Sequence, residues 1–205
     1  MARFLGVFLA CLMFGMHGAE AKPAQQPFVP SGTATDMPTG LAELCRAQPA
    51  TCDRLAATPA PTVSTAVSTT GPDAPDADKT RLRLLKRIDG MVNARVRQQS
   101  DMLSYGVGEL WRPSGSGRNA VGDCEDLAIE KRLELIDAGF PPERLFFAVV
   151  YQSGIGLHTV LVARLDGGDM VLDSRSSFVE PWQDTRYQWL IAEHPGMPTR
   201  WTTAS

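Results

Sequence analysis

Apolar side chains recur three or four positions apart in one stretch of the chain: Leu85, Ile88, Val92 and Val96. Residues at this spacing share one face of an α-helix. The pattern therefore predicts an amphipathic helix over residues 79–98. The cations of this stretch form its solvated face rather than a nucleic-acid contact: Arg81, Arg83, Lys86 and Arg87.

A second helix and three strands are predicted farther along the chain. The helix begins near Asp123 and ends at Gly139, because an acidic residue favours a helix start and a glycine shortly before a proline favours a helix end. Runs of β-branched, aromatic and other apolar residues predict strands over 145–151, 157–165 and 170–173. An Asp-Gly-Gly sequence joins the last two strands and indicates a hairpin. A helix followed by an antiparallel β-sheet places the chain in the α+β fold class.

The first 21 residues have the pattern of a secretory signal peptide. Arg3 precedes a largely apolar run over 4–16, and Ala19-Glu20-Ala21 is a small-x-small cleavage site. A buried helix and a lipoprotein signal ending at Cys11 are the alternatives, and the residues before Cys11 make a poor lipobox. We expect a mature chain that begins near Lys22 and is periplasmic or secreted.

Composition divides the rest of the chain and excludes several classes of protein. Residues 22–40 lack apolar periodicity, and residues 56–78 hold almost only small residues and proline, which is typical of a leader and a linker. We expect a signal peptide over 1–21, a Pro/Ala/Thr-rich N-terminal segment over 22–78 and one domain over 79–205. A net charge of −3 argues against nucleic acid as a partner. No apolar stretch after the signal is long enough to span a bilayer.

Export changes the interpretation of the cysteines. Without Cys11, the mature chain holds Cys45, Cys52 and Cys124, and an odd number in an oxidising compartment suggests one disulfide and one free thiol. Cys45 and Cys52 flank a short segment with a proline that favours a turn. A local disulfide between them contributes about 2–3 kcal/mol through loop-closure entropy. Cys124 is left unpaired.

Cys124 lies at the predicted start of the second helix, within Gly-Asp-Cys-Glu-Asp. The N–H groups and the dipole at a helix N-terminus favour an anion, as a nucleophilic thiolate requires. The same N–H groups can hold an oxyanion. The alternative is a small buried cysteine that packs against the sheet.

A histidine and an aspartate are predicted to lie at one edge of the sheet. His158 opens the second strand and Asp173 closes the third, so the hairpin brings both to the same edge. Facing Cys124, they would form a Cys-His-Asp triad with nucleophile, base and orienting acid. Taken singly, His158 also fits an ordinary edge histidine and Asp173 a strand-end turn residue. The other histidine of the mature chain, His194, has the surroundings of a surface loop.

Three carboxylates next to Cys124 create an electrostatic problem: Asp123, Glu125 and Asp126. In the first helical turn they complement the dipole, and Asp123 can cap the helix. A negative charge about 6 Å from the sulfur nevertheless costs the thiolate roughly 3 kcal/mol. Either the carboxylates point away or a cation neutralises them. Carboxylate and carbonyl oxygens suit Ca²⁺ better than Zn²⁺.

Several motifs in this order resemble one known family, over about residues 79–201. They are Tyr105-Gly106, Glu109-Leu110-Trp111, Gly122-Asp123-Cys124-Glu125-Asp126-Leu127-Ala128, Leu157-His158-Thr159-Val160-Leu161, Val171-Leu172-Asp173 and Pro181-Trp182. Together they resemble the LapG-like bacterial transglutaminase-like cysteine peptidases. The Gly-Asp-Cys-Glu-Asp block is the most specific of them.

The resemblance implies a papain-like or transglutaminase-like core with Cys124, His158 and Asp173 as the triad. It implies that Asp123 and Glu125 bind calcium, and that part of the 56–78 stretch packs on the domain. It implies peptide-bond hydrolysis in a periplasmic or surface protein, such as a large adhesin. It also implies an inner-membrane receptor that senses cyclic di-GMP. Trp111 or a neighbouring loop group is a candidate second donor to the oxyanion.

The same triad supports other chemistry, because a fold does not determine the acyl acceptor. Transglutaminase, acyltransferase and peptidoglycan amidase activities are alternatives to the peptidase. A different class is a catalytically silent exported binding domain in which Cys124 only packs. That interpretation predicts an inert thiol.

Overall fold

A computed structural model describes residues 26–56 and 74–204. Its centre is a seven-stranded antiparallel sheet in the order β1-β9-β8-β4-β5-β6-β7. The strands are β1 (Ala34–Thr35), β4 (Leu145–Gln152), β5 (Gly156–Leu165), β6 (Gly168–Leu172), β7 (Glu180–Pro181), β8 (Gln188–His194) and β9 (Met197–Thr203). A separate parallel pair joins β2 (Arg97–Gln98) and β3 (Val121–Gly122).

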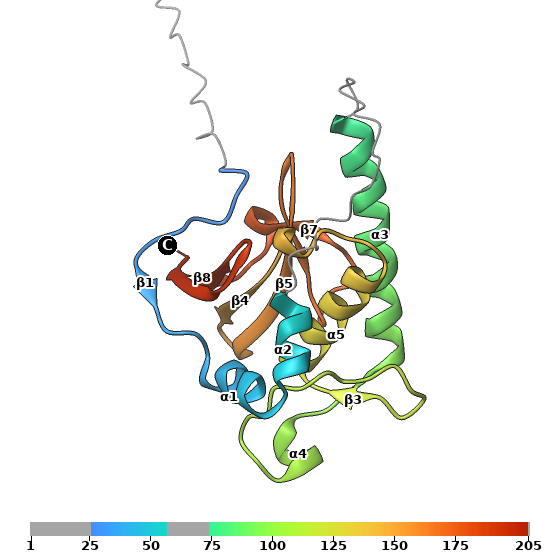
Figure 1. Ribbon diagram of the computed structural model, residues 1–205, viewed down its shortest axis with the longest axis vertical. Helices are drawn as coiled ribbons and strands as arrows, with labels where there is room; N and C mark the ends of the chain where they lie inside the picture. Colours follow the sequence, from blue (N-terminus) through green and yellow to red (C-terminus); the bar gives the residue numbers. More distant parts are fainter. Residues whose placement is uncertain (1–25, 57–73, 205) are drawn as a thin grey trace, which may run out of the picture.

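Helices cover one face of the sheet. The helices are α1 (Thr39–Ala47), α2 (Pro49–Ala56), α3 (Ala74–Arg95), α4 (Asp101–Tyr105) and α5 (Cys124–Asp137). Figure 1 shows α5 between the strands and the long helix α3, and α5 packs against both β5 and α3. Because α5 is enclosed on several sides, even its charged residues Lys131 and Arg132 are buried.

Alternation along the strands separates two apolar clusters. On β5, Leu161 and Ala163 belong to the cluster shared with the helices, whereas Val160 and Val162 belong to a cluster on the opposite face. The N-terminal Val29 helps to cover that opposite face. The molecule is therefore a layered α+β fold, as the sequence predicts.

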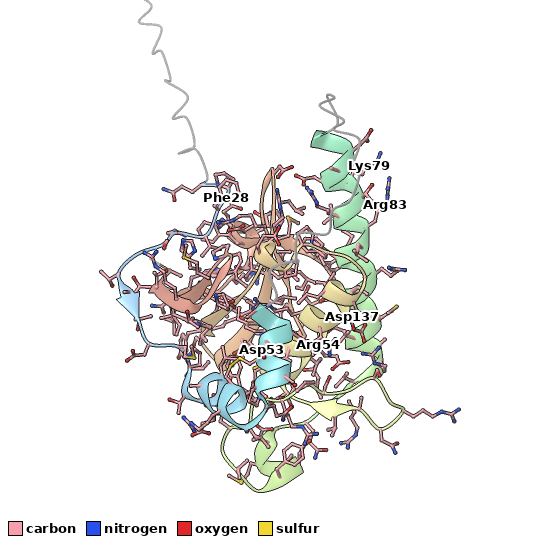
Figure 2. The ribbon with its side chains drawn as sticks, viewed as in Figure 1. Phe28, Asp53, Arg54, Lys79, Arg83 and Asp137 are labelled. Carbon is pink, nitrogen blue, oxygen red and sulfur yellow. A yellow bond between two sulfur atoms is a disulfide. The ribbon has the colours of Figure 1, made fainter. Side chains whose placement is uncertain are left out.

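The predicted central elements are confirmed with small shifts in their boundaries. The amphipathic helix runs over Ala74–Arg95 instead of 79–98. Three of the four periodic apolar residues are buried in it, and the fourth, Val96, is buried directly after its end. Figure 2 shows Lys79 and Arg83 on the outer side of α3. The predicted strands correspond to β4, β5 and β6, although Asp173 lies just after β6 instead of in it.

The hairpin of β8 and β9 was not predicted. His194, expected in a surface loop, ends β8 instead. Glu193 interrupts the apolar pattern of β8, yet it is only 2% exposed because its carboxylate pairs with Arg132 at 2.6 Å. A strand that contains a buried, paired charge cannot be predicted from the pattern of hydrophobic residues alone.

The expectation of a loose leader over 22–40 was wrong for the described residues from 26 onward. Ala34 and Thr35 pair with Thr202 and Trp201 of β9. Val29 is buried, and its N–H donates to the Asp169 carboxylate at 2.8 Å. Backbone hydrogen bonds hold this segment, so it needs no apolar periodicity. Residues 1–21 and 57–73 lie outside the described residues, so the signal peptide stays a prediction. The linker predicted over 56–78 was wrong at its two described ends, because Ala56 ends α2 and residues 74–78 begin α3. It stays a prediction only for 57–73.

The segment before α3 contributes to the same core as the rest of the chain. Leu41, Leu44 and Leu55 of α1 and α2 are buried in the cluster under the helices. A disulfide between Cys45 and Cys52 joins these two helices. Within the described ranges, no helix has the length and hydropathy needed to cross a membrane.

Candidate active site

Cys124 is the first residue of α5, and only Asp123 separates it from the β3 strand. A glycine precedes this turn because a Cβ at Gly122 would lie 2.6 Å from the Cβ of Asp126. The Sγ atom of Cys124 lies 3.4 Å from the backbone N–H of Thr159, which donates to it, and 3.0 Å from Oε2 of Glu125. The nucleophile candidate therefore contacts the residue that follows His158 on β5.

His158 and Asp173 meet at one end of the β5–β6 hairpin. Leu161 pairs with Leu172, so His158 lies three residues before the pairing and Asp173 one residue after it. Nε2 of His158 and Oδ1 of Asp173 are 2.7 Å apart, and both side chains are buried. This bond leaves Nδ1 as the imidazole nitrogen that can accept a proton. The predicted proximity of these two residues is confirmed.

Asp173 has further partners that the sequence did not reveal. The backbone N–H of Arg175 donates to Oδ1 at 2.9 Å, and the hydroxyl of Tyr187 donates to Oδ2 at 2.5 Å. Burial by itself would raise the pKa of Asp173. The hydrogen bonds from His158, Tyr187 and Arg175 outweigh burial and hold this pKa below its usual range.

The loop that carries Asp173 is held by two side-chain amides. Nδ2 of Asn93 on α3 donates to the carbonyls of Asp173 and Ser176 at 2.9 and 3.0 Å. Nε2 of Gln98 on β2 donates to the carbonyl of Ser174 at 2.6 Å. Both amides come from elements far from this loop in sequence, so no local pattern could have predicted them.

A cluster of carboxylates lies on the other side of Cys124. Ligand atoms of Asp101, Asp123 and Glu125 all lie within 4.8 Å of one another. Asp123 precedes α5 but does not cap it with its side chain, because its Oδ2 accepts the backbone N–H of Asp101 at 3.2 Å. Asp101 was missed by the sequence analysis, since it lies 22 residues before Asp123. Asp126 points elsewhere and accepts the N–H of Arg112 at 2.9 Å.

Comparisons with known proteins show which family the chain belongs to. The family model of the bacterial transglutaminase-like cysteine proteinases matches residues 31–205. The chain belongs to this family. No curated protein matches the sequence.

Among solved structures, the chain is similar to LapG of Legionella pneumophila. The calcium-bound form is 19% identical, with a TM-score of 0.45 over 54% of this chain and 63% of that one. The EGTA-treated form is 19% identical, with a TM-score of 0.45 over 54% and 61%. A further LapG structure is 20% identical, with a TM-score of 0.46 over 54% and 62%. The chain thus spans less than two thirds of the solved LapG chains that it matches.

The described side chains around Cys124 disfavour its thiolate form. Burial raises the pKa of Cys124, and the neighbouring carboxylate of Glu125 raises it further. Burial also raises the pKa of Glu125 to about 7 and that of Asp126 to about 8. The predicted conflict is present, because Glu125 points at the sulfur instead of away from it.

Trp111 does not offer its indole to the site. Its Nε1 donates to Oε1 of Glu109 at 2.6 Å, and its ring packs edge-on against Phe147. The expected role as an oxyanion donor therefore finds no support. A cavity of about 330 Å³ opens beside the base side of the site, where Asp173, Tyr187 and Arg175 line it.

Proposed function

We propose that this chain is an exported cysteine peptidase that hydrolyses peptide bonds through Cys124, His158 and Asp173. The proposal rests on two neighbouring residues of β5, which connect Cys124 to Asp173. The backbone of Thr159 contacts the sulfur, and the preceding residue, His158, is hydrogen-bonded to Asp173. Membership of a cysteine proteinase family supports the same chemistry. Cys124 is also the only free cysteine among the described residues.

The proposed reaction has two steps. Nδ1 of His158 takes the proton of the Cys124 thiol, and Asp173 holds the imidazole through Nε2 and stabilises its charged form. The sulfur attacks the carbonyl carbon of the substrate amide, and backbone N–H groups at the start of α5 hold the oxyanion. His158 then gives its proton to the leaving amine. Water hydrolyses the thioester, with His158 again as the base, and the free thiol is restored.

The acidic cluster next to Cys124 has the chemistry of a calcium site. Oδ1 of Asp101 and Oδ1 of Asp123 are buried and have no hydrogen-bond partner among the described residues. Three clustered carboxylates, two of which have an unpartnered buried oxygen, suit a hard divalent cation, and oxygen ligands favour Ca²⁺. We propose Asp101, Asp123 and Glu125 as its ligands. Bound there, calcium supplies positive charge that offsets the repulsion between the carboxylates and a thiolate.

The family resemblance and the N-terminal sequence support a proposal for the substrate, the partner and the compartment. We propose a periplasmic or secreted protein whose substrate is a surface protein such as a large adhesin. An inner-membrane receptor that senses cyclic di-GMP is the proposed partner. The apolar run before Ala19-Glu20-Ala21 supports export.

The experiment that tests the proposal is alkylation of Cys124 by iodoacetamide between pH 4 and 10. Wild-type protein, His158→Ala and Asp173→Ala are compared with calcium and with EGTA, and the modified cysteine is counted by mass spectrometry. A reactive plateau that reaches well below the free-thiol pKa of about 8.5 is expected in the wild type with calcium. The plateau should be lost in His158→Ala and weakened by EGTA.

The opposite results are equally informative. A Cys124 that is unreactive in folded protein, or that titrates like a free thiol, would contradict the peptidase and favour a silent binding domain. A reactive thiol that joins glutamine to lysine side chains in place of hydrolysis would identify a transglutaminase. Cleavage is followed by labelling new N-termini in a bacterial surface-protein extract, with Cys124→Ser as the control.

A further inference from the structure

The carboxylate of Asp173 is held through both of its oxygens. Oδ1 accepts Nε2 of His158 and the backbone N–H of Arg175, and Oδ2 accepts the hydroxyl of Tyr187 at 2.5 Å. The side chain of Asp173 is only 7% exposed. A buried oxygen that lacks a donor costs free energy, so the Tyr187 hydroxyl satisfies the oxygen that His158 leaves free.

Tyr187 also contacts the base itself. The ring centroids of Tyr187 and His158 are 5.6 Å apart, and the planes are tilted by 38°. The hydroxyl therefore restrains rotation of the Asp173 carboxylate, while the ring restrains the imidazole. One side chain touches both partners of the His158–Asp173 hydrogen bond.

The segment that carries Tyr187 is itself fixed. Thr185 donates its hydroxyl to the carbonyl of Trp182 at 2.7 Å and accepts Nε1 of Trp189 at 3.2 Å. The two indoles pack edge to face, with centroids 5.6 Å apart. Tyr187 lies between these anchors, on the short connection to β8. A residue on a packed connection can hold another side chain in one orientation.

We propose that Tyr187 is a positioning residue of this site. Its hydroxyl keeps the Asp173 carboxylate in the orientation in which Oδ1 faces Nε2 of His158. Tyr187 acts through Asp173 and does not touch the sulfur. The inference rests on the proposed function, because it assigns a role in the reactivity of Cys124.

The charged and titratable groups that face Asp173 and Tyr187 come from several elements: His158 on β5, Asp89 on α3, Lys131 on α5, Arg175 after β6 and Glu180 on β7. Asp89 and Lys131 pair with each other at 2.7 Å. Removal of the Tyr187 hydroxyl leaves the burial of Asp173 unchanged and takes away one donor. The carboxylate should then take up a proton at a higher pH than in the wild type.

The test compares Tyr187→Phe with Tyr151→Phe in full-length protein with calcium. The first variant loses one oxygen and keeps the ring. The second is the matched control, because Tyr151 lies on β4 and is 40% exposed. Iodoacetamide alkylation of Cys124 should be about 5- to 20-fold slower at pH 6 in Tyr187→Phe, and its acid limb should move up by about one pH unit. Tyr151→Phe should stay within about twofold of the wild type.

A second readout follows the hydrogen bond itself. The proton shared by His158 and Asp173 is detected by NMR in protein with ¹⁵N-labelled histidine, with His194→Gln to assign the signals. In Tyr187→Phe this proton should move upfield and exchange faster with water, because the carboxylate no longer holds one orientation. Tyr151→Phe should leave it unchanged.

Two failures are told apart by the same measurements. Equal alkylation of wild-type protein and His158→Ala overturns the proposed function, and the inference with it. If the wild type depends on His158 but Tyr187→Phe keeps the wild-type acid limb and ring proton, the inference alone is overturned. An alkylation rate that is lower by the same factor at all pH values, with the acid limb and the ring proton unchanged, also overturns the inference. That result indicates a structural role only.

Discussion

The two sides of the site differ in how completely their carboxylates are paired. On the base side, both oxygens of Asp173 accept hydrogen bonds, and Asn93 holds the backbone of its loop. On the nucleophile side, Asp101 and Asp123 each have a buried oxygen without a partner among the described residues. Glu125 there faces the sulfur that it would repel as a thiolate.

This difference shows which part of the site the protein chain completes by itself. His158, Arg175 and Tyr187 donate to the Asp173 carboxylate from three separate segments, and they keep its pKa low despite burial. Around Cys124 the described side chains add negative charge, and burial raises the pKa values of the thiol and of Glu125. We infer that the base side is preorganised and that the nucleophile side depends on a cation.

The largest effect should come from the ion pair beneath the base side. Nζ of Lys131 and Oδ1 of Asp89 are 2.7 Å apart, and both side chains are 1% exposed. Lys131→Met leaves the Asp89 carboxylate buried without its partner and should lower the free energy of unfolding by about 3–5 kcal/mol. Urea unfolding measures the loss.

Two controls show whether burial is the reason for that loss. The double variant Lys131→Met/Asp89→Leu should recover most of the stability, because it leaves no unpaired charge. Arg54→Met breaks the ion pair with Asp137, whose side chains are 52% and 64% exposed. Figure 2 shows this pair on the surface where α2 meets α5, and its loss should cost less than about 1 kcal/mol. Equal costs for Arg54→Met and Lys131→Met would contradict the comparison.

The second prediction concerns the pH dependence of stability on the nucleophile side. Glu125 has a pKa of about 7 in the folded chain, above its usual value, so the folded state binds its proton more tightly than the unfolded state. Its stabilising contribution is complete below the usual carboxyl pKa and is lost as the pH rises through about 7. In EGTA, stability should fall by on the order of 3 kcal/mol between pH 5 and 8.

Glu125→Gln removes the group that titrates. In this variant the free energy of unfolding, measured by chemical denaturation in EGTA, should change less with pH than in the wild type. Asp53→Asn, at an exposed position on α2, is the control and should keep the wild-type slope. An EGTA-treated wild type that becomes more stable as the pH rises would rule out this account of Glu125.

The third prediction is that calcium stabilises the folded chain. At about 100 times its Kd, a bound ion adds about 2.7 kcal/mol, which corresponds to a rise in Tm of roughly 5–10 °C for a protein of this size. The rise should be larger at pH 8 than at pH 5, because the ligands are then ionised. Thermal melts with calcium and with EGTA measure it.

Asp101→Asn tests the ligand that the sequence analysis missed. This variant should bind calcium more weakly in calorimetry and show a smaller rise in Tm, whereas Asp53→Asn should behave like the wild type. Wild-type calcium affinity in Asp101→Asn would exclude Asp101 from the ligand set and restrict the site to Asp123 and Glu125.

The smallest effect should come from the amide that holds the Asp173 loop. Asn93→Ala removes the donors to the carbonyls of Asp173 and Ser176 and should cost about 1–2 kcal/mol. Amide hydrogen exchange of residues 174–176 should become faster, while α5 keeps its protection. Unchanged exchange in this loop would show that Gln98 alone is sufficient to hold it.

The sequence predicted the central elements well because their hydrophobic patterns are local. The periodic residues of α3 are buried, and the Asp-Gly-Gly turn joins β5 to β6. That hairpin brings His158 and Asp173 together, so their proximity on the base side of the site could be predicted from strand geometry. The N-terminal strand β1 and the hairpin of β8 and β9 were missed because backbone bonds and a buried ion pair hold them.

The remaining parts of the site depend on residues that are distant in sequence. Asn93, Asp101 and Tyr187 reach the site from α3, α4 and the connection before β8. Within its own segment, each of these three residues is an ordinary helix or loop residue. The surrounding residues that complete the site therefore carry no local signal.

Local sequence patterns are sufficient to predict the fold class, the position of Cys124 at a helix start and the conflict between its thiolate and the adjacent carboxylates. These features depend on residues a few positions apart, whose geometry is set by helix and strand periodicity. Only the tertiary structure decided that Tyr187 completes Asp173, that Asp101 joins the acidic cluster and that Lys131 is buried with Asp89. The physical reason is that hydrogen bonds and charges act through space, and packing alone determines which distant groups they join.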